Sequence, residues 1–265
     1  MCVRRQPVRE TDRFSGESVT HAGEARTLHL ALHAVGAIPL FYVIKNAARG
    51  LAALTLPIAL LIGSAPAQAA PVSEVLGLSD ALEQLTVADE SRTGYTRDKF
   101  KHWNAGLDLA DGCNTRAEVL LAEASESPAV ADGCKLSGGA WTSYYDGQVV
   151  NDPAKLDIDH MVPLAESWDS GASAWTAARR EAYANDQGAE ASLVAVTARS
   201  NRQKSDQDPA TWMPPLPDAR CRYISEWIGT KLRWGLAADQ AEVDAITVYA
   251  DGPCETEVVH YTPAP

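Results

Sequence analysis

The spacing of apolar positions changes repeatedly after residue 78, and each change predicts an element. Apolar residues recur every three or four positions in six segments, which predicts helices over 79–88, 96–103, 115–124, 174–184, 220–232 and 238–249. Short apolar, β-rich runs predict strands over 140–145, 148–150, 155–162 and 193–197, the first two joined by a turn at Asp146-Gly147. The segment 125–139 is expected to be a loop and the tail after residue 254 to be loose. This succession predicts one α+β domain that is mostly helical.

The apolar run between Leu51 and Ile62 has a different character, because it is short and follows the basic stretch 45–49. Two small-x-small sites follow it, at 65–67 and 67–69. These features predict a secretory signal peptide over 43–69, with an uncleaved membrane anchor as the alternative. A GUG start codon printed as Val43 would explain the polar residues before it. We therefore expect 1–42 to be a misassigned N-terminal extension and 70–265 to be the secreted domain, with no stable membrane association after cleavage.

Cysteine usage agrees with export. One of the five cysteines, Cys2, lies in the N-terminal extension, and the other four are Cys113, Cys134, Cys221 and Cys254. An even number in an exported chain predicts two disulfides, for which three connectivities are possible. Sequential pairing, 113 with 134 and 221 with 254, closes the shorter loops, and each bridge would contribute about 2–4 kcal/mol. A zinc site is disfavoured because no Cys-x-x-Cys pair is present.

The charge of the chain argues against general binding to nucleic acid. Residues 1–69 hold 7 of the 23 basic and 4 of the 35 acidic side chains, so residues 70–265 carry a formal net charge of −15. A surface of this sign repels a polyanion at long range. Any affinity for nucleic acid must therefore come from a local cationic cleft and from a bound metal.

Two carboxylates and a histidine lie close together on the predicted strand 155–162, in the order Asp157, Asp159, His160. Alternate residues of a strand share a face, so both aspartates are expected on one side and His160 on the other. Carboxylate oxygens suit a divalent metal, and an imidazole suits removal of a proton from water. This short stretch therefore predicts hydrolytic chemistry assisted by a metal.

A second group of polar residues begins at Asn201, which is expected to open a further helix. Its side chain offers a neutral oxygen ligand. Arg202 and Lys204 follow as cations suited to phosphate, and we expect both to contact the phosphates of a substrate. An oxygen-rich ligand set favours Mg²⁺ or Mn²⁺ over zinc.

These residues belong to an ordered series of motifs that resembles the HNH nuclease family, whose core is a ββα-metal finger. The closest likeness is to secreted bacterial HNH endonucleases with a GmrSD C-terminal-like HNH domain. The series covers most of 92–235 and comprises Tyr95-Thr-Arg-Asp, Asp111-Gly-Cys-Asn-Thr-Arg, Gly139 to Gly147, Asp157 to Leu164, Ser170 to Trp175, Ala184 to Asp186, Asn201 to Lys204 and Asp208-Pro-Ala-Thr-Trp.

The resemblance implies a metal finger at about 155–212 and a role for each of its polar residues. Asp159 and Asn201 are expected to hold the metal, with Asp157 in contact with it or directly behind it. His160 is expected to remove a proton from the attacking water, and the products should carry 5′-phosphate and 3′-hydroxyl ends. Glu166 is expected to support the site or the fold.

One position departs from the family pattern. Many HNH proteins have a middle asparagine about nine residues before the last one, and it holds the loop that carries the base. Here that position is Ser192, whose hydroxyl cannot donate and accept as an amide does. Asn185 is the alternative residue for this supporting role.

The sequence thus predicts a secreted, monomeric, disulfide-bonded HNH endonuclease that hydrolyses nucleic acid, with DNA favoured over RNA. The alternative is a non-catalytic extracellular binding protein that retains the motif as a structural metal site. The acidic surface and the missing middle asparagine lend that alternative some support.

Overall fold

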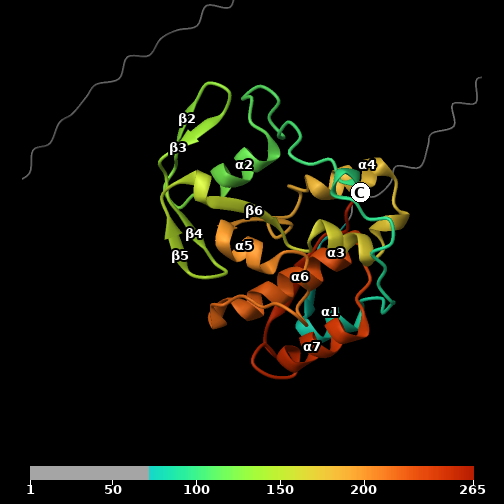
Figure 1. Cartoon of the computed structure of the whole chain (residues 1–265). Helices are drawn as coiled ribbons and strands as arrows, with labels where there is room; N and C mark the ends of the chain where they lie inside the picture. Colours follow the sequence, from blue (N-terminus) through green and yellow to red (C-terminus); the bar gives the residue numbers. More distant parts are fainter. Residues whose placement is uncertain (1–71) are drawn as a thin grey trace, which may run out of the picture. The chain divides into compact units, whose positions relative to one another are not determined.

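The computed structural model describes residues 72–265, so the expectations for 1–42, for 43–69 and for Cys2 lie outside the described residues. The described residues form the predicted α+β fold, with short helices around small two-stranded sheets (Figure 1). The helices are α1 (Leu78–Glu83), α2 (Thr115–Ala122), α3 (Leu164–Asp169), α4 (Ala177–Ala184), α5 (Ala198–Lys204), α6 (Arg220–Trp234) and α7 (Gln240–Ala250). The strands are β1 (Glu74–Gly77), β2 (Ala129–Ala131), β3 (Lys135–Ser137), β4 (Trp141–Ser143), β5 (Gln148–Val150), β6 (Leu156–His160), β7 (Leu193–Thr197) and β8 (Val258–Tyr261).

The centre of the fold is a ββα unit formed by β6, β7 and α5. The two strands pair antiparallel, with Asp159 opposite Val194 and His160 opposite Leu193. Helix α5 follows β7 directly, because the Thr197 side chain caps its first turn by accepting from the Ser200 amide. The helix therefore begins three residues before Asn201, which lies in its interior and does not open it.

The two faces of the β6–β7 sheet pack against different clusters of apolar side chains. On one face, Leu156 and Ile158 join Leu193 and Ala195 in a cluster with Trp141 and with α2. On the other face, the valines of β7 belong to the main core, which also contains the apolar side chains of α6. Because β6 alternates between these faces, its aspartates point toward the side of the main core and His160 points away from it.

Helix α6, which lies below α5 in the view of Figure 1, supplies the largest share of the main core. Tyr223, Trp227 and Ile228 of this helix have no exposed surface, as their apolar spacing predicts. The helix ends where Gly235 adopts a left-handed conformation with φ of 67°, which a glycine takes without steric cost. The predicted helix over 220–232 is thus confirmed and is two residues longer.

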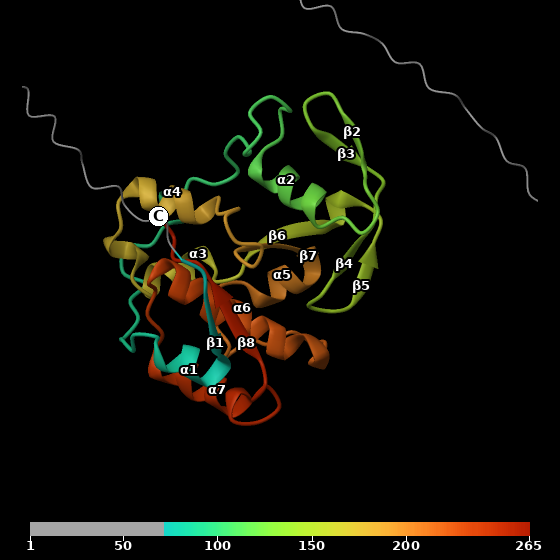
Figure 2. The same ribbon diagram turned by 180° about the vertical axis from the view of Figure 1, so that it is seen from behind.

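The expectation of a loose tail is wrong. Residues 258–261 form β8, which pairs antiparallel with β1, so the two ends of the described chain lie side by side over α6 (Figure 2). Val259 of β8 has no exposed surface. The apolar surface of α6 thus holds the tail in place, which local spacing in the sequence did not indicate.

Two other segments differ from their prediction. The segment 96–103, expected as a helix, contains only a 3₁₀ turn at Arg97–Lys99, after which Phe100 becomes extended and enters the core. The segment 125–139, expected as a loop, contains the hairpin of β2 and β3. Both elements are too short to give a clear periodicity in the sequence.

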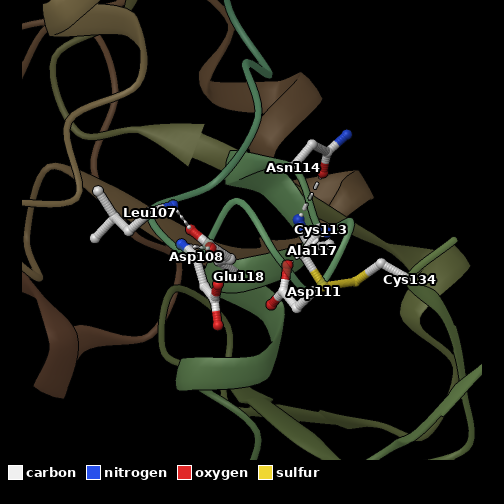
Figure 3. Close-up of a disulfide and its surroundings, with 8 residues drawn as sticks. All are labelled: Leu107, Asp108, Asp111, Cys113, Asn114, Ala117, Glu118 and Cys134. Carbon is white, nitrogen blue, oxygen red and sulfur yellow. Dashed lines mark hydrogen bonds between the residues drawn. A yellow bond between two sulfur atoms is a disulfide. The ribbon is translucent and has the colours of Figure 1, made fainter.

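Both disulfides of the sequential pairing are present, joining Cys113 to Cys134 and Cys221 to Cys254. The first connects the loop before α2 to the β2–β3 hairpin (Figure 3). The amides of Leu107 and Asp108 in the same loop donate hydrogen bonds to the Glu118 carboxylate of α2, at 2.7 and 3.0 Å. The bridge and these hydrogen bonds fix a segment that has few apolar contacts of its own.

Within residues 72–265, no helix has the length and apolar character needed to cross a membrane.

Candidate active site

The end of β6, the middle of α5 and the 3₁₀ turn at Arg97–Lys99 meet around a cavity of about 470 Å³. Four of the predicted site residues, Asp159, His160, Asn201 and Arg202, line it together. Its other polar lining residues are Tyr95, Arg97, Ser205 and Asp206. Although Asp159 and His160 leave opposite faces of the strand, both reach this cavity because the strand ends there and the cavity extends around its end.

Asp159 is buried and held by two donors. Its Oδ2 accepts hydrogen bonds from the Tyr145 hydroxyl at 2.6 Å and from the Lys204 ammonium at 2.5 Å. Burial raises the pKa of Asp159, and the adjacent Lys204 charge opposes that rise. Its Oδ1 receives no hydrogen bond from any described residue, so this oxygen is the one available to a ligand in the cavity.

His160 is also buried, and one hydrogen bond identifies the ring nitrogen that carries the proton. Its Nε2 lies 3.0 Å from the carbonyl oxygen of Ala184, which can only accept, so Nε2 carries the proton. Burial lowers the pKa of His160 to about 3, a shift that the Ala184 carbonyl opposes and the charge of Arg97 reinforces. The ring is therefore neutral at physiological pH and its Nδ1 has a free lone pair.

Aromatic rings fix the plane of this imidazole. The Trp103 ring stacks on it with a centroid distance of 5.7 Å and an angle of 28°, and the Tyr183 ring lies at 6.3 Å and 22°. Trp103 has a φ of 60°, a conformation that is uncommon for a bulky residue and is maintained only when the surroundings enforce it. The orientation of the His160 ring is thus set by packing as well as by its hydrogen bond.

Asn201 and Asp157 lie beside each other at the edge of the cavity. The Asn201 Nδ2 donates to the Asp157 Oδ2 at 3.3 Å, which leaves the amide oxygen of Asn201 free. Asp157 is half-buried and does not line the cavity. It orients the asparagine amide and lies behind the predicted ligands Asp159 and Asn201.

The donor set fits a hard divalent cation. One carboxylate oxygen of Asp159 and the amide oxygen of Asn201 are free of other partners among the described residues and belong to one cavity. Both are oxygen donors of the kind that Mg²⁺ and Mn²⁺ prefer, and water would complete the coordination. No thiolate lies in this cavity, since all four cysteines of the described residues form disulfides.

Lys204 is not a phosphate ligand, which corrects the expectation from the sequence. Its side chain is 0% exposed, and the ammonium donates to Asp159 and to the carbonyl oxygens of His160 and Met161 at 2.9 and 2.8 Å. All three ammonium protons are therefore used inside the protein. Arg202, in contrast, is 77% exposed, lines the cavity and lies 3.5 Å from Asp157, so it remains accessible to a substrate phosphate.

The two candidates for the middle asparagine have different surroundings. The Ser192 hydroxyl donates to Asp186 at 2.6 Å and forms no hydrogen bond with the histidine. Asn185 follows Ala184, whose carbonyl binds His160, and its amide bonds the backbone of Lys101 and of Asn104 at 2.9 Å. These bonds hold the segment that carries Trp103, so the geometry favours Asn185 for the supporting role.

Glu166 lies away from the cavity, in a buried ionic cluster. It accepts from the Lys231 ammonium at 3.0 Å, and Lys231, which is 0% exposed, also donates to Glu242 at 2.5 Å. Glu90 and Asp169 lie close by, so that Glu90, Glu166 and Asp169 form a group of carboxylates within 4.8 Å. Lys231 and Arg92, which bonds Asp169 at 2.6 Å, supply positive charge to this group. Glu166 therefore supports the fold.

We expect this cluster to make the fold less stable as the pH rises. Burial and the neighbouring Glu166 raise the pKa of Glu90 to about 8, with Asp239 adding to the rise and Lys231 opposing it. The unfolded chain releases this proton near pH 4.5, whereas the folded chain retains it up to about pH 8. The free energy of unfolding should therefore decrease as the pH rises from about 4.5 to about 8.

The substitution Glu90→Gln should remove this dependence, because an amide donates to Glu166 at any pH. The melting temperature of the variant should exceed that of the wild type at pH 8.5 and approach it at pH 5, at about 2–4 °C for each kcal/mol gained. Calorimetric melting curves at both values measure this, with Glu83→Gln, on the exposed surface of α1, as the control. Equal pH dependence in wild type and Glu90→Gln would contradict the assignment.

Arg97 is a charged residue of the cavity to which the sequence analysis assigned no role. It belongs to the motif Tyr95-Thr-Arg-Asp, which suggested its importance, yet it lies more than sixty residues before Asp159, His160 and Asn201. The hydrogen bond from His160 to the Ala184 carbonyl could not be predicted either, because every residue has a backbone carbonyl whatever its side chain. Only the folded chain brings these groups to His160.

Comparison with known proteins points to the same part of the chain. The family model for the C-terminal domain of GmrSD restriction endonucleases matches residues 96–247, a range that includes all cavity residues except Tyr95. A protein of the fungus Arthroderma benhamiae, described as an uncharacterized secreted protein, is 40% identical over 167 residues, which span 63% of this chain and 79% of the relative. No solved structure matches the chain. The comparisons thus support the predicted family, but the relative is fungal and gives no support to a bacterial source.

Proposed function

Because the chain belongs to the family of GmrSD restriction endonuclease C-terminal domains, we propose that it is a metal-dependent endonuclease of the HNH type. The protein is secreted, as its two disulfides and the description of its fungal relative indicate. The family implies a nucleic-acid substrate, and we favour DNA over RNA. The observation that carries the proposal is the convergence of Asp159, His160 and Asn201 on one cavity.

The chemistry of this chain's own residues begins at His160. Its Nδ1 takes a proton from a water molecule in the cavity, and the oxygen of that water attacks phosphorus. The hydrogen bond to the Ala184 carbonyl keeps the ring in the required tautomer and stabilises the positive charge that the ring then acquires. The 3′ oxygen leaves, so that the products carry 5′-phosphate and 3′-hydroxyl ends.

The metal would be held by Asp159 and Asn201, with Asp157 orienting the asparagine amide. A bound Mg²⁺ or Mn²⁺ would stabilise negative charge on the reacting phosphate and on the leaving oxygen. Tyr145 and Lys204 hold Oδ2 of the Asp159 carboxylate in place, which leaves its other oxygen available to the metal.

A plasmid-nicking assay tests the proposal. The full chain would be expressed in a secreting host, and the protein purified from the medium would be incubated with supercoiled plasmid and Mg²⁺ or Mn²⁺. Conversion to the open circular or linear form, abolished by a chelator, is the expected result. Binding of the metal without cleavage of DNA or of RNA would instead support the non-catalytic binding protein.

The ligand assignment predicts a loss of metal affinity in two variants. Asp159→Ala and Asn201→Ala should each weaken Mn²⁺ binding by about tenfold or more, because each removes an oxygen ligand. Titration calorimetry measures this directly. Ser192→Ala is the control, since its hydroxyl bonds Asp186 and does not contact the cavity. Unchanged affinity in both ligand variants would contradict the assignment.

Arg202→Ala should weaken substrate binding by a salt-dependent amount. A lost phosphate contact lowers the slope of log affinity against log salt by about one, because fewer counterions are released on binding. Oligonucleotide binding at several salt concentrations in EDTA measures the slope. Arg199→Ala, one turn earlier on the same helix and outside this cavity, is a matched control. An identical slope for wild type and Arg202→Ala would exclude the contact.

A further inference from the structure

Arg97 carries a positive charge that no other described residue neutralises. It is exposed at the cavity that holds Asp159, His160 and Asn201, and within residues 72–265 its guanidinium forms neither an ion pair nor a hydrogen bond. Arg92, a few residues earlier, binds two aspartates. In a domain with a net charge of −15, an unpaired guanidinium beside the reacting groups has no structural partner to explain its position.

The backbone on both sides of Arg97 is anchored. Arg92 bonds Asp169 and Asp206, both at 2.6 Å, and Trp168 donates to the Thr93 carbonyl at 3.1 Å. Lys99 donates to the carbonyl of Gly94 at 2.6 Å and lies over the Trp168 ring. Phe100 is fully buried. These contacts fix the 3₁₀ turn, so the guanidinium is presented to the cavity by a rigid segment although it is itself free.

We propose that Arg97 is a catalytic residue that binds the non-bridging oxygens of the scissile phosphate and stabilises their charge in the transition state. This inference rests on the proposed function. A guanidinium offers parallel N–H donors that match two phosphate oxygens, and it keeps its proton, so it acts by charge and not by proton transfer. A donor fixed in advance at the developing charge costs no reorganisation during the reaction.

Arg97 and Arg202 differ in the counter-charges that surround them. Arg202 lies 3.5 Å from Asp157, so part of its charge is already balanced at the edge of the cavity. Arg97 has no such counter-charge, and its field reaches the imidazole of His160. We therefore assign the scissile phosphate to Arg97 and a flanking phosphate to Arg202.

Single-turnover cleavage by the variants Arg97→Ala and Arg97→Lys tests the assignment. The protein from culture medium would be used in excess over a labelled oligonucleotide duplex with Mn²⁺. Removal of one such donor lowers the rate of the chemical step by about 10²–10³-fold in other enzymes, and we expect a loss of this size in Arg97→Ala. Arg97→Lys should recover part of the rate, since an ammonium supplies the charge without the paired geometry.

Arg199→Ala, which removes an equally exposed arginine outside the cavity, should cleave within about twofold of the wild type. Binding of the same duplex in EDTA provides a readout without metal. It should weaken less than tenfold in Arg97→Ala, because most of the interaction forms only in the transition state. A cleavage rate for Arg97→Ala within about threefold of the wild type, or a loss equal to that of Arg199→Ala, would overturn the inference.

Failure of the proposed function gives a different result. If the wild type cleaves neither DNA nor RNA, the endonuclease assignment and a catalytic role for Arg97 fall together. If the wild type cleaves and Arg97→Ala cleaves equally fast, the proposed function stands and the inference on Arg97 fails.

Discussion

The variant His160→Ala should cleave at a rate at least about 10²-fold lower than that of the wild type, with little change in metal affinity. His160 supplies the only neutral imidazole in the cavity of the described residues, and its Nδ1 is the atom able to take a proton from water there. Because the ring does not bind the metal in this arrangement, calorimetry should give Mn²⁺ affinities for variant and wild type that agree within about threefold. Single-turnover cleavage at saturating metal measures the chemical step.

Two controls separate the base from its structural contacts. Removal of the ring leaves the Ala184 carbonyl without its donor and a space beside Trp103, so some loss of stability is expected, and cleavage should be measured well below the melting temperature. Added imidazole should restore part of the rate if the lost group is a base. An activity above about a third of the wild type, or no response to imidazole, would show that His160 is not the base.

The elements that create this site were largely visible in the sequence. The apolar run Leu193 to Thr197 predicted β7 with its observed bounds, and the Asp-x-Asp-His stretch predicted β6 to within two residues. Both strands are short and buried, so their residues show the β-rich apolar character that local reasoning detects. Helix α5 was displaced by three residues, because Thr197 ends the strand and also caps the helix.

What the sequence did not reveal depends on contacts between distant segments. The pairing of β1 with β8 joins residues about 185 positions apart, and neither strand has a pattern that names its partner. Likewise, Arg97 reaches the cavity only because Arg92 bonds Asp169 and Asp206, which follow it by more than seventy residues. The spacing of residues along the chain contains no information on such pairings.

Lys204 shows most clearly what could not be predicted from the sequence alone. A charged residue three positions after a predicted metal ligand suggested an exposed cation, because lysine is rarely buried. In the fold, its ammonium lies 5.7–5.9 Å from the centroids of the Tyr145, Tyr223 and Trp227 rings and bonds Asp159. Helical geometry explains the difference, since Arg202 and Lys204 are two residues apart and therefore face opposite sides of α5.

This burial predicts a large effect on stability. The variant Lys204→Met keeps most of the side-chain volume and removes the charge, which leaves the Asp159 carboxylate buried without its counter-ion and two backbone carbonyls without a donor. Loss of one partner from a buried pair costs about 3–5 kcal/mol. Denaturant unfolding in EDTA should therefore show a decrease of this size in the free energy of unfolding.

The double variant Asp159→Asn, Lys204→Met distinguishes the ion pair from simple packing. With the carboxylate neutralised, the missing ammonium is no longer required, so the double variant should be more stable than Lys204→Met alone. Mn²⁺ should also stabilise Lys204→Met more than it stabilises the wild type, because a cation beside Asp159 replaces the lost charge. A decrease below about 1 kcal/mol in Lys204→Met, together with a lower salt slope for oligonucleotide binding, would mean that Lys204 faces the substrate. The predicted pattern is the reverse, an unchanged salt slope and a large loss of stability, as expected when Lys204 holds the aspartate in place and the phosphate contact proposed here is made by Arg202.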